Sequence, residues 1–154
     1  MTKVCVFGAG AIGGFLAGSL HEAGANVSLV ARGPHLEAIL NDGLSVIRDG
    51  SRLTFSLAAS DKASDFCVQD YIIIAVKAHG ITGIIDELKP LIGPNTTVVS
   101  AVNGLPWWYF YKANSGTPLD DLPIEAVDPK GKIWHEIGPE KAIGCVVYPA
   151  CEII

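Results

Sequence analysis

A glycine-rich hexapeptide, Gly8-Ala-Gly-Ala-Ile-Gly13, follows directly on the apolar segment Val4–Phe7 and restricts the fold more than any other feature of the chain. In the pattern G-x-G-x-x-G, the first glycine permits a tight turn, the second lets the main chain approach a pyrophosphate, and the third lets a helix pack closely on a strand. Apolar residues then recur at helical spacing as far as Ala23, Gly24 stands where a helix would end, and Val27–Ala31 is a second apolar segment. The pattern predicts one strand–helix–strand unit of a dinucleotide-binding domain.

The residue that follows the second strand is Arg32. A site for NAD would carry an acidic side chain there, which would bind the ribose 2′-hydroxyl. A planar guanidinium suits a 2′-phosphate instead, because it can donate two parallel charge-assisted hydrogen bonds. We therefore expect NADP(H) as the cofactor; the alternative is that Arg32 is a solvated charge at the end of a strand.

The rest of the chain alternates between helical and strand patterns. A short helix is expected from Pro34 to Gly43, followed by a hairpin around Asp49-Gly50-Ser51. The run Tyr71–Val76 is apolar without alternation, which is typical of a parallel strand covered on both faces. A helix over Ile81–Leu88 and strands over Thr96–Val102 and Ala142–Tyr148 complete the pattern. It predicts an α/β fold, a doubly wound, mostly parallel Rossmann-type sheet with a small antiparallel excursion.

Two further polar residues stand just after predicted strands, where ligands of such sheets bind. They are Lys77 and Asn103, and each has a plain alternative, a solvated lysine and an Asn-Gly turn. Five consecutive aromatic residues, Trp107-Trp-Tyr-Phe-Tyr111, cannot all lie on one side, so some should line a pocket or meet another domain or subunit. Residues 112–140 show no clear period and are expected to be a functional or poorly ordered loop.

The composition excludes several classes of protein. The 154 residues suffice for one domain, which we place at residues 1–154. A net charge of −5 without a basic cluster argues against nucleic acid, since phosphate neutralisation supplies most of that affinity. The four cysteines lack metal-ligand spacing, so we expect no metal and the reduced thiols of a cytoplasmic protein. Glycines interrupt the uncharged stretch Val4–Leu20, so we expect neither a targeting segment nor a membrane span.

In content and in order, five segments together resemble the ketopantoate reductase (2-dehydropantoate 2-reductase) family. These segments are Gly8–Gly13, Leu29-Val-Ala-Arg32, Ala75-Val-Lys77-Ala, Asn103-Gly-Leu-Pro-Trp-Trp108 and Gly144-Cys-Val-Val-Tyr-Pro-Ala150. The resemblance covers essentially the whole chain. It implies an NADPH-dependent reduction of the 2-keto group of ketopantoate to pantoate, a step of pantothenate biosynthesis.

The resemblance also assigns roles to single residues. The loop formed by Gly8, Ala9, Gly10, Ala11, Ile12 and Gly13 would bind the pyrophosphate, and Arg32 the 2′-phosphate. Lys77 would lie beside the cofactor, Asn103 would contact both cofactor and substrate, and Ala150 would border the nicotinamide site. No catalytic residue is expected within the chain, because the family's general-acid lysine belongs to a second, helical domain that has no counterpart here.

We therefore expect the chain to be the N-terminal, cofactor-binding half of a reductase, too incomplete to turn over a keto acid alone. A homo-oligomer is expected, formed through the absent domain or through an exposed apolar face of a chain that is 49% hydrophobic. Two alternatives remain open: a reductase of a different keto acid, and a stand-alone domain that senses NADP(H).

Overall fold

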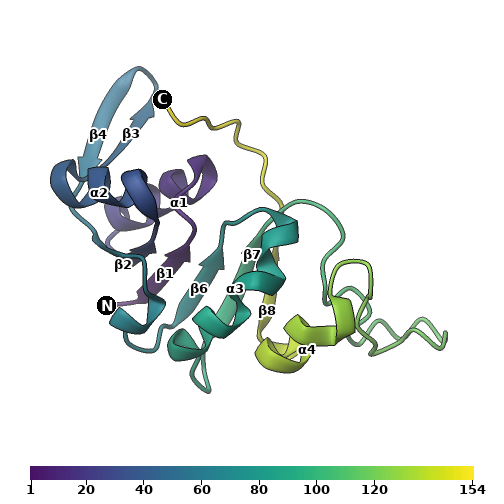
Figure 1. The fold of residues 1–154 in the computed structure, drawn as a ribbon. Helices are drawn as coiled ribbons and strands as arrows, with labels where there is room; N and C mark the ends of the chain where they lie inside the picture. The colour runs from purple at the N-terminus through teal and green to yellow at the C-terminus, as the bar shows by residue number, and fades with distance from the viewer.

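A six-stranded parallel sheet forms the centre of the molecule, with the strand order β5–β2–β1–β6–β7–β8 (Figure 1). The computed structural model describes all residues from Met1 to Ile154. The strands of this sheet are β1 (Lys3–Phe7), β2 (Asn26–Val30), β5 (Ala58–Ser60), β6 (Tyr71–Ile74), β7 (Thr97–Ala101) and β8 (Ala142–Cys145). The chain builds outward from β1 through β2 to β5, then returns to β1 and builds outward again through β6, β7 and β8. This reversal between β1 and β6 confirms the doubly wound α/β fold and creates the crevice in which such sheets bind ligands.

Four helices and one hairpin cover the sheet. The helices are α1 (Ala11–Glu22), α2 (Gly33–Asp42), α3 (Ile81–Leu88) and α4 (Lys132–Ile137), and short 3₁₀ turns occupy Ala63–Asp65, Ala78–Gly80, Lys89–Leu91, Pro129–Gly131 and Pro139–Lys141. The hairpin pairs β3 (Leu44–Arg48) with β4 (Ser51–Phe55) in an antiparallel manner. Its turn residues Asp49 and Gly50 have φ angles of 51° and 75°, as a two-residue hairpin turn requires. None of the helices has the length and apolar character that crossing a membrane demands.

Alternate residues of the central strands enter two separate cores. Val6 and Ile73 pack on the side of α1, α2 and the hairpin, together with Ala17 and Ile39. On the opposite side, a second cluster joins β1 and β6 to α3 and α4 through Cys5, Phe7, Ile72, Ile74, Ile85, Leu88, Ile133 and Ile137. Because both faces are covered, every position of these strands must be apolar, which explains the unbroken run that begins at Tyr71.

The structure corrects the expected pattern in the second half of the chain. β8 ends at Cys145, three residues earlier than expected, and β5 was not expected. The segment 112–140 was expected to have no regular structure, yet it contains α4 and two of the 3₁₀ turns. The connection from β7 to α4 does extend away from the sheet as an irregular loop (Figure 1).

A buried carboxylate explains why so short a helix forms there. Asp128 is fully buried, and its two oxygens accept hydrogen bonds from the backbone N–H groups of Ile133 (2.8 Å) and Trp134 (2.9 Å). These are donors of the first turn, which have no partner within the helix. The helix is thus stabilised by a residue that precedes it by four positions, a signal that hydrophobic periodicity does not contain.

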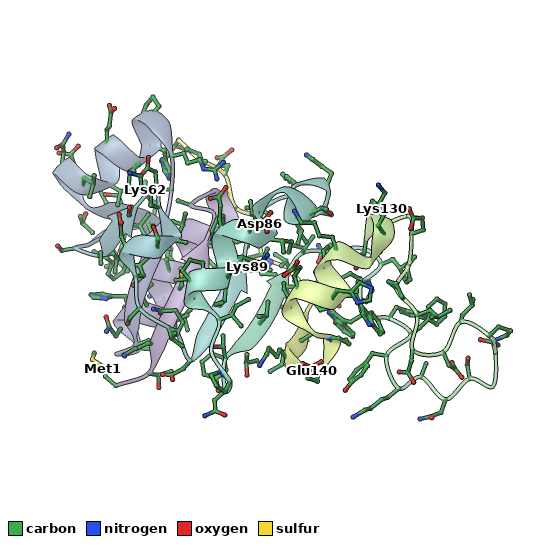
Figure 2. All side chains as sticks on the ribbon, turned by 60° about the horizontal axis from the view of Figure 1, so that its bottom comes forward. Met1, Lys62, Asp86, Lys89, Lys130 and Glu140 are labelled. Carbon is green, nitrogen blue, oxygen red and sulfur yellow. The ribbon has the colours of Figure 1, made fainter.

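Charged side chains also join α3 to α4. Lys89 lies 2.9 Å from Asp86, and both are labelled in Figure 2. Lys89 also lies 2.9 Å from Glu136, and Lys132 of α4 lies 3.0 Å from Asp86. Hydrogen bonds from Lys89 and Lys132 lower the pKa of Asp86 below its usual range. The carboxylate remains well exposed, so these ion pairs orient the two helices more than they stabilise them.

We expect Asp128→Asn to lower the free energy of unfolding by about 1–3 kcal/mol, because a neutral amide offers one acceptor in place of two charged ones. Thermal or urea denaturation followed by circular dichroism measures the change. Asp120→Asn is the matched control, because Asp120 also accepts backbone hydrogen bonds, from Ser115 and Gly116, but in an exposed loop. Equal stability of both variants and the unmodified chain would contradict the capping role.

Candidate functional site

The glycine loop lies between the carboxyl end of β1 and the first turn of α1. Gly8 has a φ angle of +107°, a conformation that other residues rarely adopt, and a Cβ there would lie 2.9 Å from a side-chain carbon of Val76. A Cβ on Gly13 would overlap the carbonyl oxygen of Gly8. Gly8 is therefore required by its turn conformation and by the chain that follows β6, and Gly13 by the close approach of α1 to the end of β1.

Gly10 is required by nothing in the protein itself. Its φ angle of −64° suits any residue, and a Cβ there would meet no atom within 4 Å. It is the residue before α1, and that helix has neither a side-chain cap nor an acidic residue in its first turn. The first backbone N–H groups of α1 therefore face open space beside Gly10, an arrangement that accepts an anionic phosphate.

Arg32 lies at the carboxyl end of β2 and immediately precedes α2. Its side chain is 61% exposed, and its Nη2 atom lies 2.6 and 2.7 Å from the two carboxylate oxygens of Glu87 on α3. Sequence reasoning missed Glu87, because it lies 55 residues away on a helix face with no distinctive pattern.

The other two strand-end residues differ in their surroundings. Lys77 follows β6, is exposed and makes no ion pair. Asn103 follows β7, and its side-chain amide pairs with the backbone of Val147: Nδ2 donates to the Val147 carbonyl (2.9 Å), and the Val147 N–H donates to Oδ1 (2.8 Å). The amide thus fixes the chain just beyond β8. Its contact with a cofactor or substrate stays a prediction, as does that of Lys77.

Beyond Val147 the chain crosses toward the hairpin (Figure 1). This segment forms one wall of a cavity of about 670 Å³, and Ala9, Gly10 and Ala11 of the glycine loop contribute to the same cavity. Ala150 lies in this wall, so the structure brings it together with the glycine loop. Arg32, Lys77 and Asn103 do not line this cavity.

His35 is a further residue of this cavity that sequence reasoning set aside. Its Nε2 atom is buried without a hydrogen-bond partner. The residue lies in the first turn of α2, three positions after Arg32, and this spacing could have indicated from the sequence that the two lie close together.

A second cavity, of about 980 Å³, opens at the carboxyl ends of β7 and β8. Asn103 is part of its lining, and so are Trp107 and Trp108 from the aromatic segment, Ile133 of α4 and His79. Trp107 is buried, whereas Tyr109 is 54% exposed, so the aromatic segment divides between the interior and the surface as expected. The indole N–H groups of Trp107 and Trp108 and the hydroxyl of Ser100 are buried without partners in this lining.

The remaining reactive groups do not form a catalytic centre. No three or more His, Cys, Asp or Glu side chains are grouped so that they could hold a metal ion. Burial raises the pKa of the Cys5 thiol to about 12, which keeps it protonated and unreactive at neutral pH. The glycine-loop amides, Arg32, Lys77 and Asn103 remain the candidate binding groups, and their contacts with a ligand stay predictions.

Comparisons with known proteins agree with this geometry. The family model described as ketopantoate reductase PanE/ApbA matches residues 4–106. A 2-dehydropantoate 2-reductase of Mesorhizobium japonicum is 49% identical over 152 residues, which are 98% of this chain and 46% of that protein.

Solved structures give the same result. A putative ketopantoate reductase from Ralstonia solanacearum MolK2 superimposes with a TM-score of 0.90 at 39% identity, over 100% of this chain and 47% of that one. A D-mandelate dehydrogenase, solved with NADH and anilino(oxo)acetate, has a TM-score of 0.63 at 27% identity, over 68% of this chain and 35% of that one.

This chain spans less than half the length of these relatives. The family model nevertheless covers two thirds of the chain, including the glycine loop, Arg32, Lys77 and Asn103. The chain belongs to the ketopantoate reductase PanE/ApbA family.

Proposed function

We propose that this chain is the cofactor-binding half of an NADP(H)-dependent oxidoreductase that reduces a 2-keto acid, with 2-dehydropantoate as its substrate. The observation that carries the proposal is the contrast within the glycine loop. Gly8 and Gly13 are required by packing, whereas Gly10 leaves open space beside the uncapped first turn of α1. A protein that used this turn only for structure would have no need of glycine at position 10.

Each polar group of the site has a distinct role in this proposal. The loop amides hold the pyrophosphate, and Arg32, at the end of β2, holds the 2′-phosphate. The bound nicotinamide supplies a hydride to the keto carbon. Lys77 and Asn103 lie on the other side of the crevice, after β6 and β7, where they orient the nicotinamide half and the substrate. The residue that protonates the keto oxygen is proposed to lie outside these 154 residues, and such a general acid contributes about 10²–10⁴-fold to the rate.

The second cavity favours another keto acid as the alternative substrate. It adjoins Asn103, is lined by Trp107 and Trp108, and has a volume of about 980 Å³, which far exceeds the side chain of ketopantoate. The related D-mandelate dehydrogenase was solved with anilino(oxo)acetate, a 2-keto acid derivative with an aromatic ring. A 2-keto acid with an aromatic substituent is therefore the second candidate.

The family resemblance supports two further proposals. We place the protein in the cytoplasm, where pantothenate biosynthesis would supply its substrate. We also propose that it self-associates, either through a second domain or through the apolar surface that includes Ile143, Val146 and Tyr148, which are 48%, 68% and 88% exposed.

Alanine at position 10 should weaken cofactor binding without unfolding the protein. We expect Gly10→Ala to change the free energy of unfolding by less than about 1 kcal/mol, because the backbone there suits any residue. Its Cβ would occupy the space of the pyrophosphate, so the Kd for NADPH should rise by about 10- to 150-fold. Gly13→Ala is the matched contrast and should cost about 1–3 kcal/mol of stability or more. Denaturation curves and NADPH fluorescence titrations measure both effects; unchanged binding by Gly10→Ala would contradict the proposed site.

Arg32→Ala should discriminate between the two nicotinamide nucleotides. Loss of the charged hydrogen bonds to the 2′-phosphate should weaken NADPH binding by about 1.5–3 kcal/mol. NADH lacks this phosphate, so its Kd should change little. Calorimetric titration of both nucleotides measures the difference, and an equal loss for both would refute the assignment of Arg32.

The substrate is tested by following NADPH oxidation in a protein that extends this chain to the full length of its relatives. We expect 2-dehydropantoate to give a higher kcat/KM than phenylglyoxylate if the family's reaction applies, and the reverse order if the aromatic cavity receives the substrate. Trp108→Ala, at the partly buried indole of the same lining, should lower kcat/KM more for the aromatic keto acid than for 2-dehydropantoate. Oxidation with neither compound would contradict both candidates.

A further inference from the structure

The ion pair between Arg32 and Glu87 brings an acidic residue to the place where the sequence lacks one. Cofactor-binding folds of this type read the adenosine ribose at the end of β2, with a carboxylate for NAD and an arginine for NADP. Here Arg32 follows β2 by two residues, and the carboxylate of Glu87 comes from α3, on the far side of the switch point between β1 and β6. The arginine that is typical of an NADP site and the carboxylate that is typical of an NAD site therefore contact each other here.

The ion pair with Arg32 is the only polar side-chain contact of Glu87. Its carboxylate makes no ion pair or hydrogen bond other than those to Nη2 of Arg32, at 2.6 and 2.7 Å. The adjacent Asp86 has different partners, Lys89 and Lys132, between α3 and α4. The two carboxylates of α3 thus divide between joining the helices and engaging Arg32.

A two-donor contact with a 2′-phosphate and the contact with Glu87 compete for Nη2, because both two-donor edges of a guanidinium include this atom and both carboxylate oxygens of Glu87 lie on it. A bidentate phosphate contact therefore displaces Glu87, and a contact through Nε or Nη1 alone leaves it in place; in either case a negative charge lies close to a dianion. The ribose 2′-hydroxyl of NADH imposes no such exchange, since a hydroxyl can donate to a carboxylate that remains paired with arginine. The presence of Glu87 therefore opposes NADPH and leaves NADH unopposed.

We propose that Glu87 is a specificity-determining residue that competes with the 2′-phosphate for Arg32. It thereby reduces the ratio by which this chain binds NADPH more tightly than NADH. This inference rests on the proposed function, because it assumes that the nucleotide binds with its adenosine ribose at Arg32. Glu87 would then be a second residue, beside Arg32, that distinguishes the riboses of the two nucleotides, and it belongs to a different element, α3.

Glu87→Gln tests the inference, because it keeps the shape of the side chain and removes its charge. An exposed ion pair of this kind is weak. Its removal, together with the removal of the repulsion between Glu87 and the 2′-phosphate, should lower the Kd for NADPH by about three- to tenfold. The Kd for NADH should stay the same or rise. Calorimetric or fluorescence titration of the unmodified 154-residue chain and the variant provides this readout without any turnover.

The matched control is Glu136→Gln. Glu136 is also an exposed carboxylate in an ion pair, with Lys89, and its replacement changes the net charge by the same amount. If general electrostatic attraction caused the tighter binding, both variants would show it, and the inference would be overturned. In the double variant Arg32→Ala/Glu87→Gln, the gain for NADPH should largely disappear, since the competition needs Arg32.

The outcomes separate this inference from the proposed function. If the unmodified chain binds neither nucleotide, both are wrong. If it binds NADPH through Arg32 but Glu87→Gln binds NADPH no more tightly than Glu136→Gln does, the proposed function stands and the specificity role of Glu87 is refuted.

Discussion

The contact between the third glycine of the loop and the carbonyl oxygen of the first determines where the rest of the structure can lie. α1 approaches β1 so closely at Gly13 that no side chain fits between them. This fixes the direction in which α1 leaves the sheet, and with it the parallel return to β2. The loop at the junction leaves open space at Gly10, beside the uncapped first turn of α1. Packing and ligand binding therefore use different glycines of one short motif.

The order of the strands converts this junction into a site. Parallel strands present their carboxyl ends at one edge of the sheet, so residues that follow β1, β2, β6 and β7 gather there although they are far apart in sequence. Arg32 stands on one side of the switch point, and Lys77 and Asn103 stand on the other. The cofactor proposed above, NADP(H), is elongated, with phosphates near its middle and a 2′-phosphate near one end, so it would span the two sides.

The sequence predicted the features that depend on interactions between residues close together in the chain, and it missed those that depend on contacts between distant residues. The glycine loop, α1, the hairpin and the buried strand β6 were predicted, because turn residues and apolar periodicity encode them locally. α4 was missed because its stability comes from the buried carboxylate of Asp128, whose role appears only when the chain folds around it. β5 is three residues long and pairs only with β2, too short for a pattern. Glu87 reached Arg32 through the fold alone, so no local spacing could have indicated it.

Asn103 shows how a predicted binding residue and an observed structural role can coexist. A side-chain amide has two N–H donors and two acceptor lone pairs on its oxygen. Holding the backbone of Val147 uses one donor and one lone pair. One N–H and one lone pair remain, and the residue is exposed at the mouth of the larger cavity. The same amide can therefore fix the chain beyond β8 and still offer a donor and an acceptor to a ligand, and its two bonds to Val147 hold the amide plane in one orientation.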